Sequence, residues 1–105
     1  MPRSLPNERE AIFLAILMGG QEKYGREILK DFEVRSNRKL PIGSLYTTLD
    51  RIEAKGFLRS REGEPNPELG GNRRRFYKIT GAGVAALNEL RQMMTSPGVT
   101  GAAHA

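Results

Sequence analysis

The sequence predicts a mainly α-helical fold with one β-hairpin (α+β), in the order helix, helix, helix, strand, strand, helix. Four segments repeat apolar residues at three- and four-residue spacing, as amphipathic helices do. Between the third and fourth of them, two short runs with alternating side chains flank a loop rich in proline and glycine, which is typical of a hairpin. At 105 residues the chain is long enough for one domain and too short for two that each bury a core.

The first predicted helix begins near Pro6 and Asn7, where the asparagine side chain can cap the free backbone amide of Glu10. Apolar residues between positions 11 and 18 surround most of this helix. A helix that is apolar on nearly all sides is usually buried between other elements. Gly19 and Gly20 then end it.

The second predicted helix covers about residues 24–35 and is amphipathic. Ile28, Leu29 and Phe32 recur at helical spacing and mark its inward face. The polar stretch RSNRK, residues 35–39, is then a turn to the third helix.

Pro41 opens the third predicted helix, at the first helical position that proline favours. At 100° per residue one face of this helix is apolar, and its residues are Ile42, Leu45, Leu49 and Ile52. The opposite face is small or polar and has Tyr46 and Thr48 at its borders; its residues are Gly43, Ser44, Thr47, Asp50 and Arg51. Gly56 is well placed for the left-handed residue that closes a helix.

The hairpin is predicted from a strand at 57–61, a loop at 62–72 and a returning strand at 73–80. Thr80 then caps a fourth helix with one long apolar stripe. These elements predict a domain over residues 1–80, a C-terminal helix over 81–95 and a flexible tail over 96–105. A helix pair with a short connection, followed by a two-stranded hairpin, is the winged form of the helix-turn-helix.

The net charge of +5 is concentrated in one segment. Residues 55–78 carry seven lysines and arginines against three acids, a net charge of +4, whereas residues 1–54 have a net charge of +1. A localised basic patch attracts polyanions, because neutralising their charges releases bound counterions. The alternative is a solvated surface, which any charge run allows but which explains the uneven placement poorly.

Several classes of protein are disfavoured by composition. The chain has no cysteine, and its only histidine, His104, lies in the small-residue tail, so no metal site or cofactor is expected. No Ser/His or Cys/His pair exists, so we do not expect an enzyme. The longest apolar run, residues 11–18, is too short to span a bilayer, and the N-terminus does not read as a signal peptide. A cytoplasmic location with no membrane partner is expected.

Two segments together resemble the PadR-like family of bacterial transcriptional repressors. The first, LPIGSLYTTLDRIEAKGFL, matches its motif at Gly43, Leu45, Tyr46, Leu49, Arg51, Ile52, Glu53, Gly56, Phe57 and Leu58. The second, GGNRRRFYKITGAGVAAL, matches it at Arg74, Arg75, Phe76, Tyr77, Thr80 and Gly83. The YGREI segment, residues 24–28, is similar to the family's second helix. The resemblance covers roughly residues 8–92 and implies a winged helix-turn-helix homodimer that binds a palindromic operator.

The resemblance also implies dimerisation through the helix that follows the hairpin. Many members continue into a longer C-terminal helical domain, whereas here the fourth helix ends near Met94, as in the family's short subgroup. That subgroup's pore for flat aromatic ligands involves a tryptophan, and this chain has none. A small-molecule effector is therefore left open and unidentified.

The predicted contacts with double-stranded DNA come from the third helix and the hairpin. Short side chains let the helix approach a major groove, where Arg51 can read guanine or hold a phosphate; the helix candidates are Gly43, Ser44, Tyr46, Thr47, Thr48 and Arg51. The hairpin candidates are Asn72, Arg73, Arg74 and Arg75, of which alternate residues must face opposite sides of the strand. The alternative reading of Arg51 is an ion pair with Asp50 or Glu53.

A homodimer is expected because two apolar surfaces lack partners. The first helix is apolar nearly all round, and the fourth carries a stripe that either covers the core or meets a second subunit. The interface candidates are Phe13, Leu17, Leu87, Leu90 and Met94.

Two other functions remain open at the level of sequence. Winged helices also serve as protein-interaction modules without specific DNA binding, although their hairpins need not be basic. RNA binding is the second, but the exposed aromatic residues of a stacking platform are few.

Overall fold

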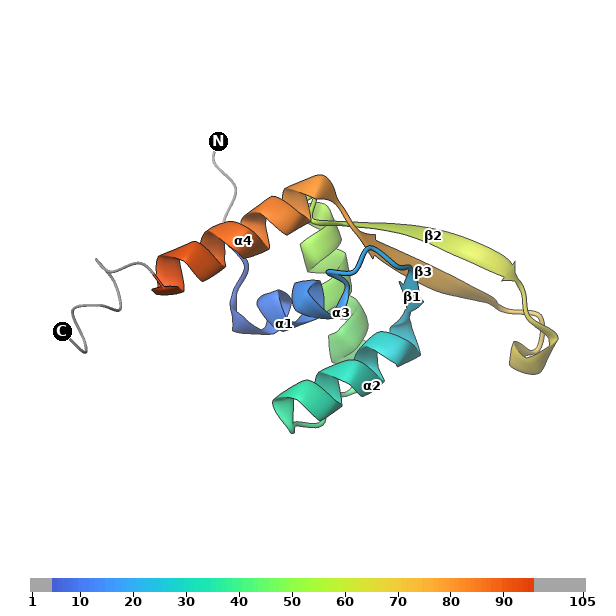
Figure 1. Cartoon of the computed structure of the whole chain (residues 1–105). Helices are drawn as coiled ribbons and strands as arrows, with labels where there is room; N and C mark the ends of the chain where they lie inside the picture. The colour runs from blue at the N-terminus through green and yellow to red at the C-terminus, as the bar shows by residue number, and fades with distance from the viewer. Residues whose placement is uncertain (1–4, 96–105) are drawn as a thin grey trace.

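The computed structural model describes residues 5–95, so the expected tail at 96–105 lies outside the described residues. Its elements in chain order are α1 (Glu8–Ile16), β1 (Lys23–Tyr24), α2 (Gly25–Ser36), α3 (Ile42–Ala54), β2 (Leu58–Pro65), the 3-10 helix η1 (Pro67–Leu69), β3 (Arg73–Ile79) and α4 (Gly81–Thr95). The four helices gather into one body, and β2 and β3 project from it as a long hairpin (Figure 1). The predicted α+β class and winged helix-turn-helix order are confirmed, with one additional strand, β1.

Three of the predicted helix-capping residues act as expected. The Asn7 side chain accepts a hydrogen bond from the backbone amide of Glu10 at 2.8 Å, and the Glu10 carboxylate accepts one from the amide of Asn7. Gly56 has a φ of 84°, the left-handed conformation that closes α3. The Thr80 hydroxyl accepts from the amide of Gly83 at 3.0 Å and donates to the carbonyl of Gly56 at 2.7 Å. Gly56 and Thr80 therefore mark the two ends of the hairpin, one just before β2 and the other just after β3.

The sheet is antiparallel and has the strand order β1-β3-β2. β1 is the strand that the sequence did not predict: its two residues, Lys23 and Tyr24, pair with Tyr77 and Phe76 of β3. This pairing brings the residues just before α2 against the base of the hairpin. β3 is thus the central strand, and its residues meet both β1 and β2.

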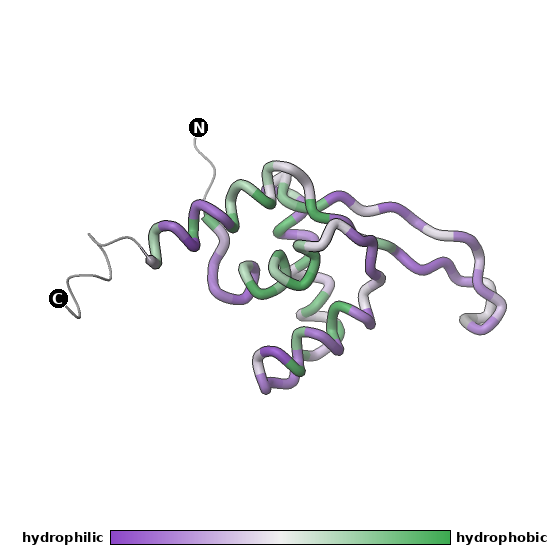
Figure 2. The backbone as a smooth tube through the Cα atoms, in the orientation of Figure 1, coloured by the Kyte–Doolittle hydropathy of each residue, from purple (hydrophilic) through white to green (hydrophobic). Residues whose placement is uncertain are grey.

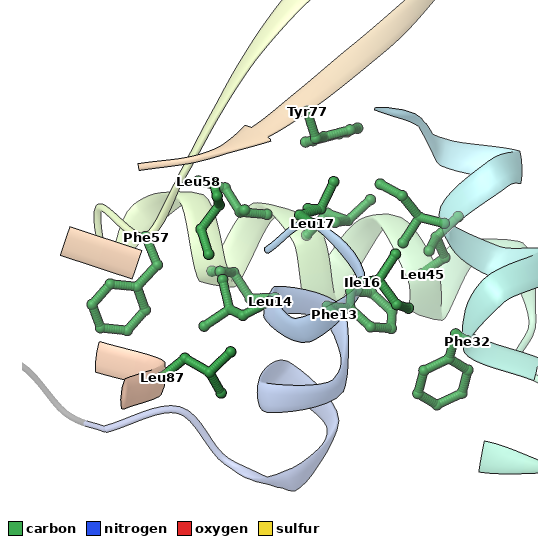
Figure 3. Packing of buried hydrophobic residues seen from close by; sticks show 14 of the residues in the cluster. Phe13, Leu14, Ile16, Leu17, Phe32, Leu45, Phe57, Leu58, Tyr77 and Leu87 are labelled. Carbon is green, nitrogen blue, oxygen red and sulfur yellow. The ribbon is translucent and has the colours of Figure 1, made fainter. Parts of the chain in front are cut away.

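The hydrophobic core lies where α1, α2 and α3 meet the base of the sheet (Figure 3). Phe13 of α1 packs edge-on against Phe32 of α2, with ring centroids 5.1 Å apart. Tyr77 reaches into the core from β3 and is 1% exposed. Hydropathy follows this arrangement, because α1 is mostly hydrophobic whereas the hairpin is mostly hydrophilic (Figure 2).

The core also corrects the predicted dimer contacts. Phe13 and Leu17 were expected to face a second subunit, but their side chains are 0% and 1% exposed. They are core residues of their own subunit, and the expectation is wrong for both. A helix that is apolar nearly all round does not reveal in its sequence which side meets its own core.

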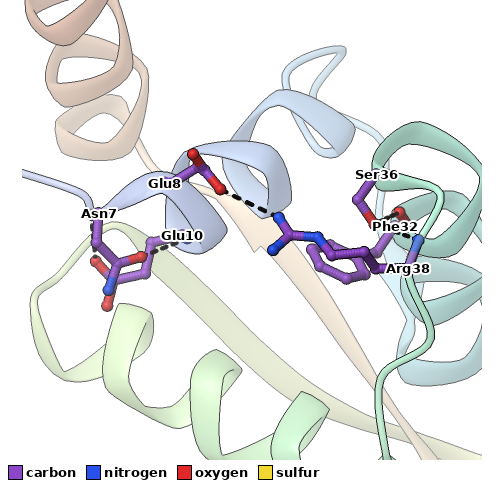
Figure 4. A network of polar contacts seen from close by, with 6 residues as sticks. All are labelled: Asn7, Glu8, Glu10, Phe32, Ser36 and Arg38. Carbon is purple, nitrogen blue, oxygen red and sulfur yellow. Dashed lines mark hydrogen bonds and ion pairs between the residues drawn. The ribbon is translucent and has the colours of Figure 1, made fainter.

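α1 is joined to the rest of the body by ion pairs at its N-terminal end. The Glu10 side chain is fully buried, and its Oε1 accepts a hydrogen bond from the Nζ of Lys55 at 2.7 Å. Lys55 is the residue that directly follows α3. On the exposed side, Glu8 pairs with Arg38, which follows α2 (Figure 4). The buried pair matters more, because solvent screens the exposed one.

α4 changes character along its length. Gly83, Ala86 and Leu87 in its first half are buried in the core, whereas Met93 and Met94 near its end are 47% and 62% exposed. The end of α4 lies far from the hairpin tip in the molecule (Figure 1). No helix within residues 5–95 has the length and apolar character needed to cross a membrane.

Substituting Gly83→Ala is expected to destabilise the fold. A Cβ at this position would overlap the backbone carbonyl oxygen of Phe57, which cannot move without shifting the start of β2. Overpacking of this kind typically costs about 1–3 kcal/mol. The free energy of unfolding from urea denaturation should fall by about that amount.

Gly81→Ala is the matched control, because nothing lies within 4 Å of a Cβ there. It should change the free energy of unfolding by less than about 0.5 kcal/mol. Equal losses in the two variants would contradict the packing of α4 against Phe57.

Candidate nucleic-acid interface

The outward face of α3 is small and polar, as predicted. Gly43, Thr47, Asp50 and Arg51 are exposed, and Ser44 is half-buried. Opposite them, Leu45, Leu49 and Ile52 are fully buried in the core. Ile42, which was expected on the inward face, is 42% exposed because it lies in the first turn of the helix, at the edge of the core. Pro41 is the residue before α3 rather than its first residue.

Thr48 departs from the prediction that it borders the outward face. Its side chain is 4% exposed, and its hydroxyl donates a hydrogen bond to the carbonyl of Ser44 at 2.8 Å. A threonine hydroxyl can be buried on a helix in this way, because the carbonyl one turn earlier satisfies it. Thr48 is therefore not available to a ligand at the surface, and we remove it from the candidate residues.

Tyr46 connects α3 with the beginning of α2. Its ring is 38% exposed and covers Gly25, the first residue of α2. A Cβ on Gly25 would lie only 2.5 Å from the Tyr46 hydroxyl oxygen. The absence of a side chain at position 25 therefore lets the two helices meet, and the phenol group remains accessible beside α2.

The arginines of β3 alternate between the two faces of the hairpin, as predicted. Arg75 lies on the same face as the buried Tyr77, toward α3, because the two are two positions apart along a strand. Arg74 lies on the other face, where its guanidinium stacks on the ring of Tyr24 at 4.4 Å from the centroid. Arg73 donates a hydrogen bond to the carbonyl of Gly63 in β2 at 3.3 Å.

On the face toward α3, three polar side chains connect the helix with the hairpin. The carboxylate of Glu53 in α3 accepts a bifurcated hydrogen bond from the Ser60 hydroxyl, at 2.9 Å to Oε1 and 2.8 Å to Oε2, and a second hydrogen bond from the Ser60 amide at 3.2 Å. The same hydroxyl accepts one from the Arg75 Nη1 at 3.1 Å. The position of Arg75 is thereby tied to α3.

On the opposite face, rings and guanidinium groups stack from β2 to β1. Arg61 lies over the ring of Phe76 at 4.9 Å, and that ring meets Tyr24 edge-on with centroids 6.0 Å apart. Glu22 accepts two hydrogen bonds from Arg61, at 2.6 and 2.8 Å. Those hydrogen bonds lower the pKa of Glu22 and raise the pKa of Arg61. The positive charge of Arg61 is thus already paired within the chain.

Sequence reasoning did not identify Glu22 and Tyr24 as part of this surface. Their roles depend on β1, a strand of two residues that is too short to show an alternating pattern. The only available signal was the aromatic residue directly before the second helix.

One groove is lined by residues of β1, α2, α3 and β3, and we call it the wing groove. It has a volume of about 760 Å³ and lies open to solvent. Its lining residues are Tyr24, Gly25, Arg26, Tyr46, Asp50, Glu53, Arg73, Arg74, Arg75 and Tyr77. Asp50, at one edge of the outward face of α3, and the arginine-bearing strand therefore border the same space, whereas Gly43, Ser44, Thr47 and Arg51 do not line it. Arg26, at the start of α2, is a basic residue of this groove that the sequence analysis did not select.

Charges in and around the wing groove are only partly neutralised. Burial raises the pKa of the Tyr77 hydroxyl to about 12, and the nearby carboxylate of Asp50 contributes in the same direction. Among residues 5–95, none of the ion pairs includes Asp50 or Arg51. The ion pair considered for Arg51 is thus not formed, since Glu53 is bound to Ser60 instead.

A second groove, the α1–α4 groove, is predominantly apolar and has a volume of about 530 Å³. Its lining residues are Pro6, Glu8, Ala11, Ile12, Ala15, Leu87, Leu90, Arg91, Met94 and Thr95. Of the predicted interface residues, Leu90 and Met94 lie here, while Leu87 is only 3% exposed and forms its floor. On α1 the apolar residues that line this groove are the half-buried Ala11, Ile12 and Ala15, in place of Phe13 and Leu17.

No group of three or more histidine, cysteine, aspartate or glutamate side chains that could hold a metal ion occurs in the part of the chain that the structure describes.

Comparison with known proteins agrees with the motif in α3 and the hairpin. The family model of the transcriptional regulator PadR-like family matches residues 13–89. The chain belongs to this family. The transcriptional regulator Rv3488 of Mycobacterium tuberculosis is 36% identical to this PadR-like protein over 89 residues, which are 83% of this chain and 78% of that protein.

Solved structures share the fold. A PadR family transcription regulator from Clostridium difficile R20291 superposes with a TM-score of 0.68 at 27% identity, over 94% of this chain and all of that one. Bacillus subtilis PadR, solved in complex with operator DNA, gives a TM-score of 0.67 at 21% identity, over 81% of this chain and 47% of that one. The resemblance stated from the sequence is confirmed at the level of family and fold.

Substituting Gly25→Ala should displace the Tyr46 ring without unfolding the PadR-like protein. The new Cβ would contact the end of a partly exposed side chain, which can turn aside at a cost of roughly 1 kcal/mol or less. NMR should show shifted Tyr46 ring resonances with a nearly unchanged thermal midpoint.

Gly43→Ala is the control, because its Cβ would meet nothing within 4 Å. It should leave the Tyr46 resonances in place. Unshifted resonances in the Gly25→Ala variant would show that the ring does not cover the start of α2.

Proposed function

We propose that this PadR-like protein is a repressor that binds a palindromic operator in double-stranded DNA as a homodimer. The observation that carries the proposal is the wing groove, which Asp50, at the edge of the outward face of α3, and the arginines of β3 border together. A helix for the major groove and a basic ribbon for the adjacent backbone are the two parts of winged helix-turn-helix recognition. The same fold is bound to operator DNA in Bacillus subtilis PadR.

In this proposal α3 reads the base edges. The small or short side chains of Gly43, Ser44 and Thr47 let the helix lie close to the floor of the major groove. Arg51 is exposed on the same face and has no ion-pair partner within residues 5–95, so its guanidinium is available for a guanine. Tyr46 offers its hydroxyl to a phosphate at the border of that face.

The hairpin positions the protein on the duplex. Arg75 points toward α3 and is held there by Ser60, whereas Asn72 and Arg73 are exposed near the tip of the hairpin. These residues are suited to phosphate oxygens, contacts that fix register and orientation without reading sequence. Arg74, which stacks on Tyr24, contributes a phosphate contact from the other face.

The α1–α4 groove is the proposed dimer surface, and its occupant is a second copy of the chain. The groove is apolar, and the exposed methionine at position 94 extends it beyond the core. A contact of one patch with the same patch on another subunit has a twofold axis, which matches the symmetry of a palindromic operator.

The alternative function is a protein-interaction module without specific DNA binding. It would explain the apolar groove but not the three consecutive arginines of β3 beside α3. A contact with a neutral protein surface would leave these charges desolvated and unpaired, which is costly.

Binding to duplex DNA tests the proposal, with sequences selected from a random pool because the operator is not defined. The dissociation constant should rise steeply with salt, because phosphate contacts release counterions. Arg51→Ala should cut the preference for selected over scrambled DNA by about 10–100-fold. Arg75→Ala should weaken binding to both equally and reduce the salt slope by about one.

Arg59→Ala is the matched control, since Arg59 is exposed on the face of the hairpin that points away from α3. It removes the same charge and should leave sequence preference and salt slope nearly unchanged. Absence of salt-dependent duplex binding by the unmodified protein would refute DNA binding. Equal effects of all three substitutions would refute the assigned roles.

Substituting Met94→Glu should convert the dimer to monomers. The change places a charge in the α1–α4 groove at a position 62% exposed, so the folded subunit tolerates it. Sedimentation velocity should show the monomer at concentrations where the unmodified protein is a dimer.

Met93→Glu is the control, because this neighbouring methionine is also exposed but does not line the groove. It should remain dimeric. A monomeric unmodified protein, or a dimer that survives Met94→Glu, would contradict the proposed interface.

A further inference from the structure

We infer that Asp50 is a specificity-determining residue, whose carboxylate accepts a hydrogen bond from the exocyclic amine of a cytosine in the operator. This inference rests on the proposed DNA binding and adds a base preference to it. Asp50 is the only acid on the exposed stripe of α3. In this inference it accepts a hydrogen bond from DNA, whereas the arginines around it donate.

The position of Asp50 follows from helix geometry. It comes seven residues after Gly43, so the two lie within about 20° of each other around the helix axis. Thr47 lies between them, one turn before Asp50, and all three are exposed. Any duplex that approaches α3 closely enough to meet Gly43 and Thr47 therefore also meets the carboxylate of Asp50.

The surroundings of Asp50 leave its carboxylate without a cation. It lines the wing groove with Arg26, Arg73, Arg74 and Arg75, but none of these forms an ion pair with it, and each arginine of β3 has another partner. Arg75 donates to Ser60, Arg74 stacks on Tyr24, and Arg73 donates to the carbonyl of Gly63. Within residues 5–95 no ion pair includes Asp50. The other acid of α3, Glu53, is held by Ser60.

An unpaired carboxylate facing DNA weakens binding to most sequences. Phosphates repel it, and most major-groove base edges present acceptors, which a carboxylate cannot bind. The amine at N4 of cytosine is a donor and is the base group that aspartate and glutamate accept from. Adenine also presents a donor, its N6 amine, but beside the N7 acceptor, which repels a carboxylate. The penalty is therefore relieved best where a cytosine lies opposite position 50, and an unfavourable contact thereby produces specificity.

Arg51 complements this role from the neighbouring position. Successive residues of a helix are 100° apart, so Asp50 lies on the wing side of the exposed stripe and Arg51 on the other side. A carboxylate suits cytosine and a guanidinium suits guanine, so the two side chains select for different bases.

The test compares Asp50→Asn and Asp50→Ala with the unmodified protein, using selection from a random duplex pool followed by binding to selected and scrambled DNA. Both variants should bind scrambled DNA several-fold more tightly, because a repelled charge is gone. The ratio of selected to scrambled affinity should fall by about tenfold. Asp50→Asn should in addition change one selected cytosine to adenine, because asparagine bonds the N6 and N7 of adenine.

Glu89→Gln is the matched control, since Glu89 is exposed on α4 and its substitution changes the net charge by the same amount. It should leave both the ratio and the selected sequence unchanged. Circular dichroism melting checks that the Asp50 variants are folded, as expected for an exposed position.

The outcomes separate the two proposals. If the unmodified protein shows no salt-dependent duplex binding, the proposed function fails and this inference fails with it. If the unmodified protein binds selectively but the Asp50 variants keep the same ratio and the same bases, only the inference on Asp50 is overturned. The same holds if Glu89→Gln reproduces the effect, because the effect is then one of net charge alone.

Discussion

The carboxylate of Glu53 holds together the two halves of the surface on which the proposed function depends. It belongs to α3 and accepts hydrogen bonds from both the hydroxyl and the amide of Ser60 of β2, and Ser60 in turn holds Arg75 of β3. A two-stranded ribbon that projects from a body of helices has few contacts to set its direction. Hydrogen bonds to a charged acceptor are among the stronger ones a protein forms. The angle between helix and ribbon is therefore set at this carboxylate and at the buried Tyr77 beside it.

The opposite face of the ribbon is held by different chemistry. There Glu22, Arg61, Phe76, Tyr24 and Arg74 follow one another as an ion pair and a series of stacked rings. Two of the basic residues between positions 55 and 78 thus form ion pairs within the chain: Arg61 pairs with Glu22, and Lys55 pairs with the buried Glu10. The formal charge of this segment is therefore larger than the positive charge that is available to bind a polyanion. The arginines of β3 are still available, because none of them forms an ion pair with a carboxylate among the described residues.

Local chemistry made much of this fold predictable from sequence. Asn7, Gly56 and Thr80 end or begin helices for reasons that depend only on neighbouring residues. Features that depend on distant partners were not predictable. β1 forms because β3 offers it an edge. Phe13 and Leu17 face the core of their own subunit because α2, α3 and the sheet cover that side of α1. The apolar periodicity of a helix is the same whether that face packs against its own core or against a second subunit.

The contact between Tyr46 and Gly25 has a consequence for how this surface can evolve. The ring occupies the space that a side chain at position 25 would need, so each residue restricts the other across two helices. A larger residue at the first position of α2 requires a smaller or displaced one on α3. In related chains these two positions should therefore vary as a pair, although they are far apart in sequence.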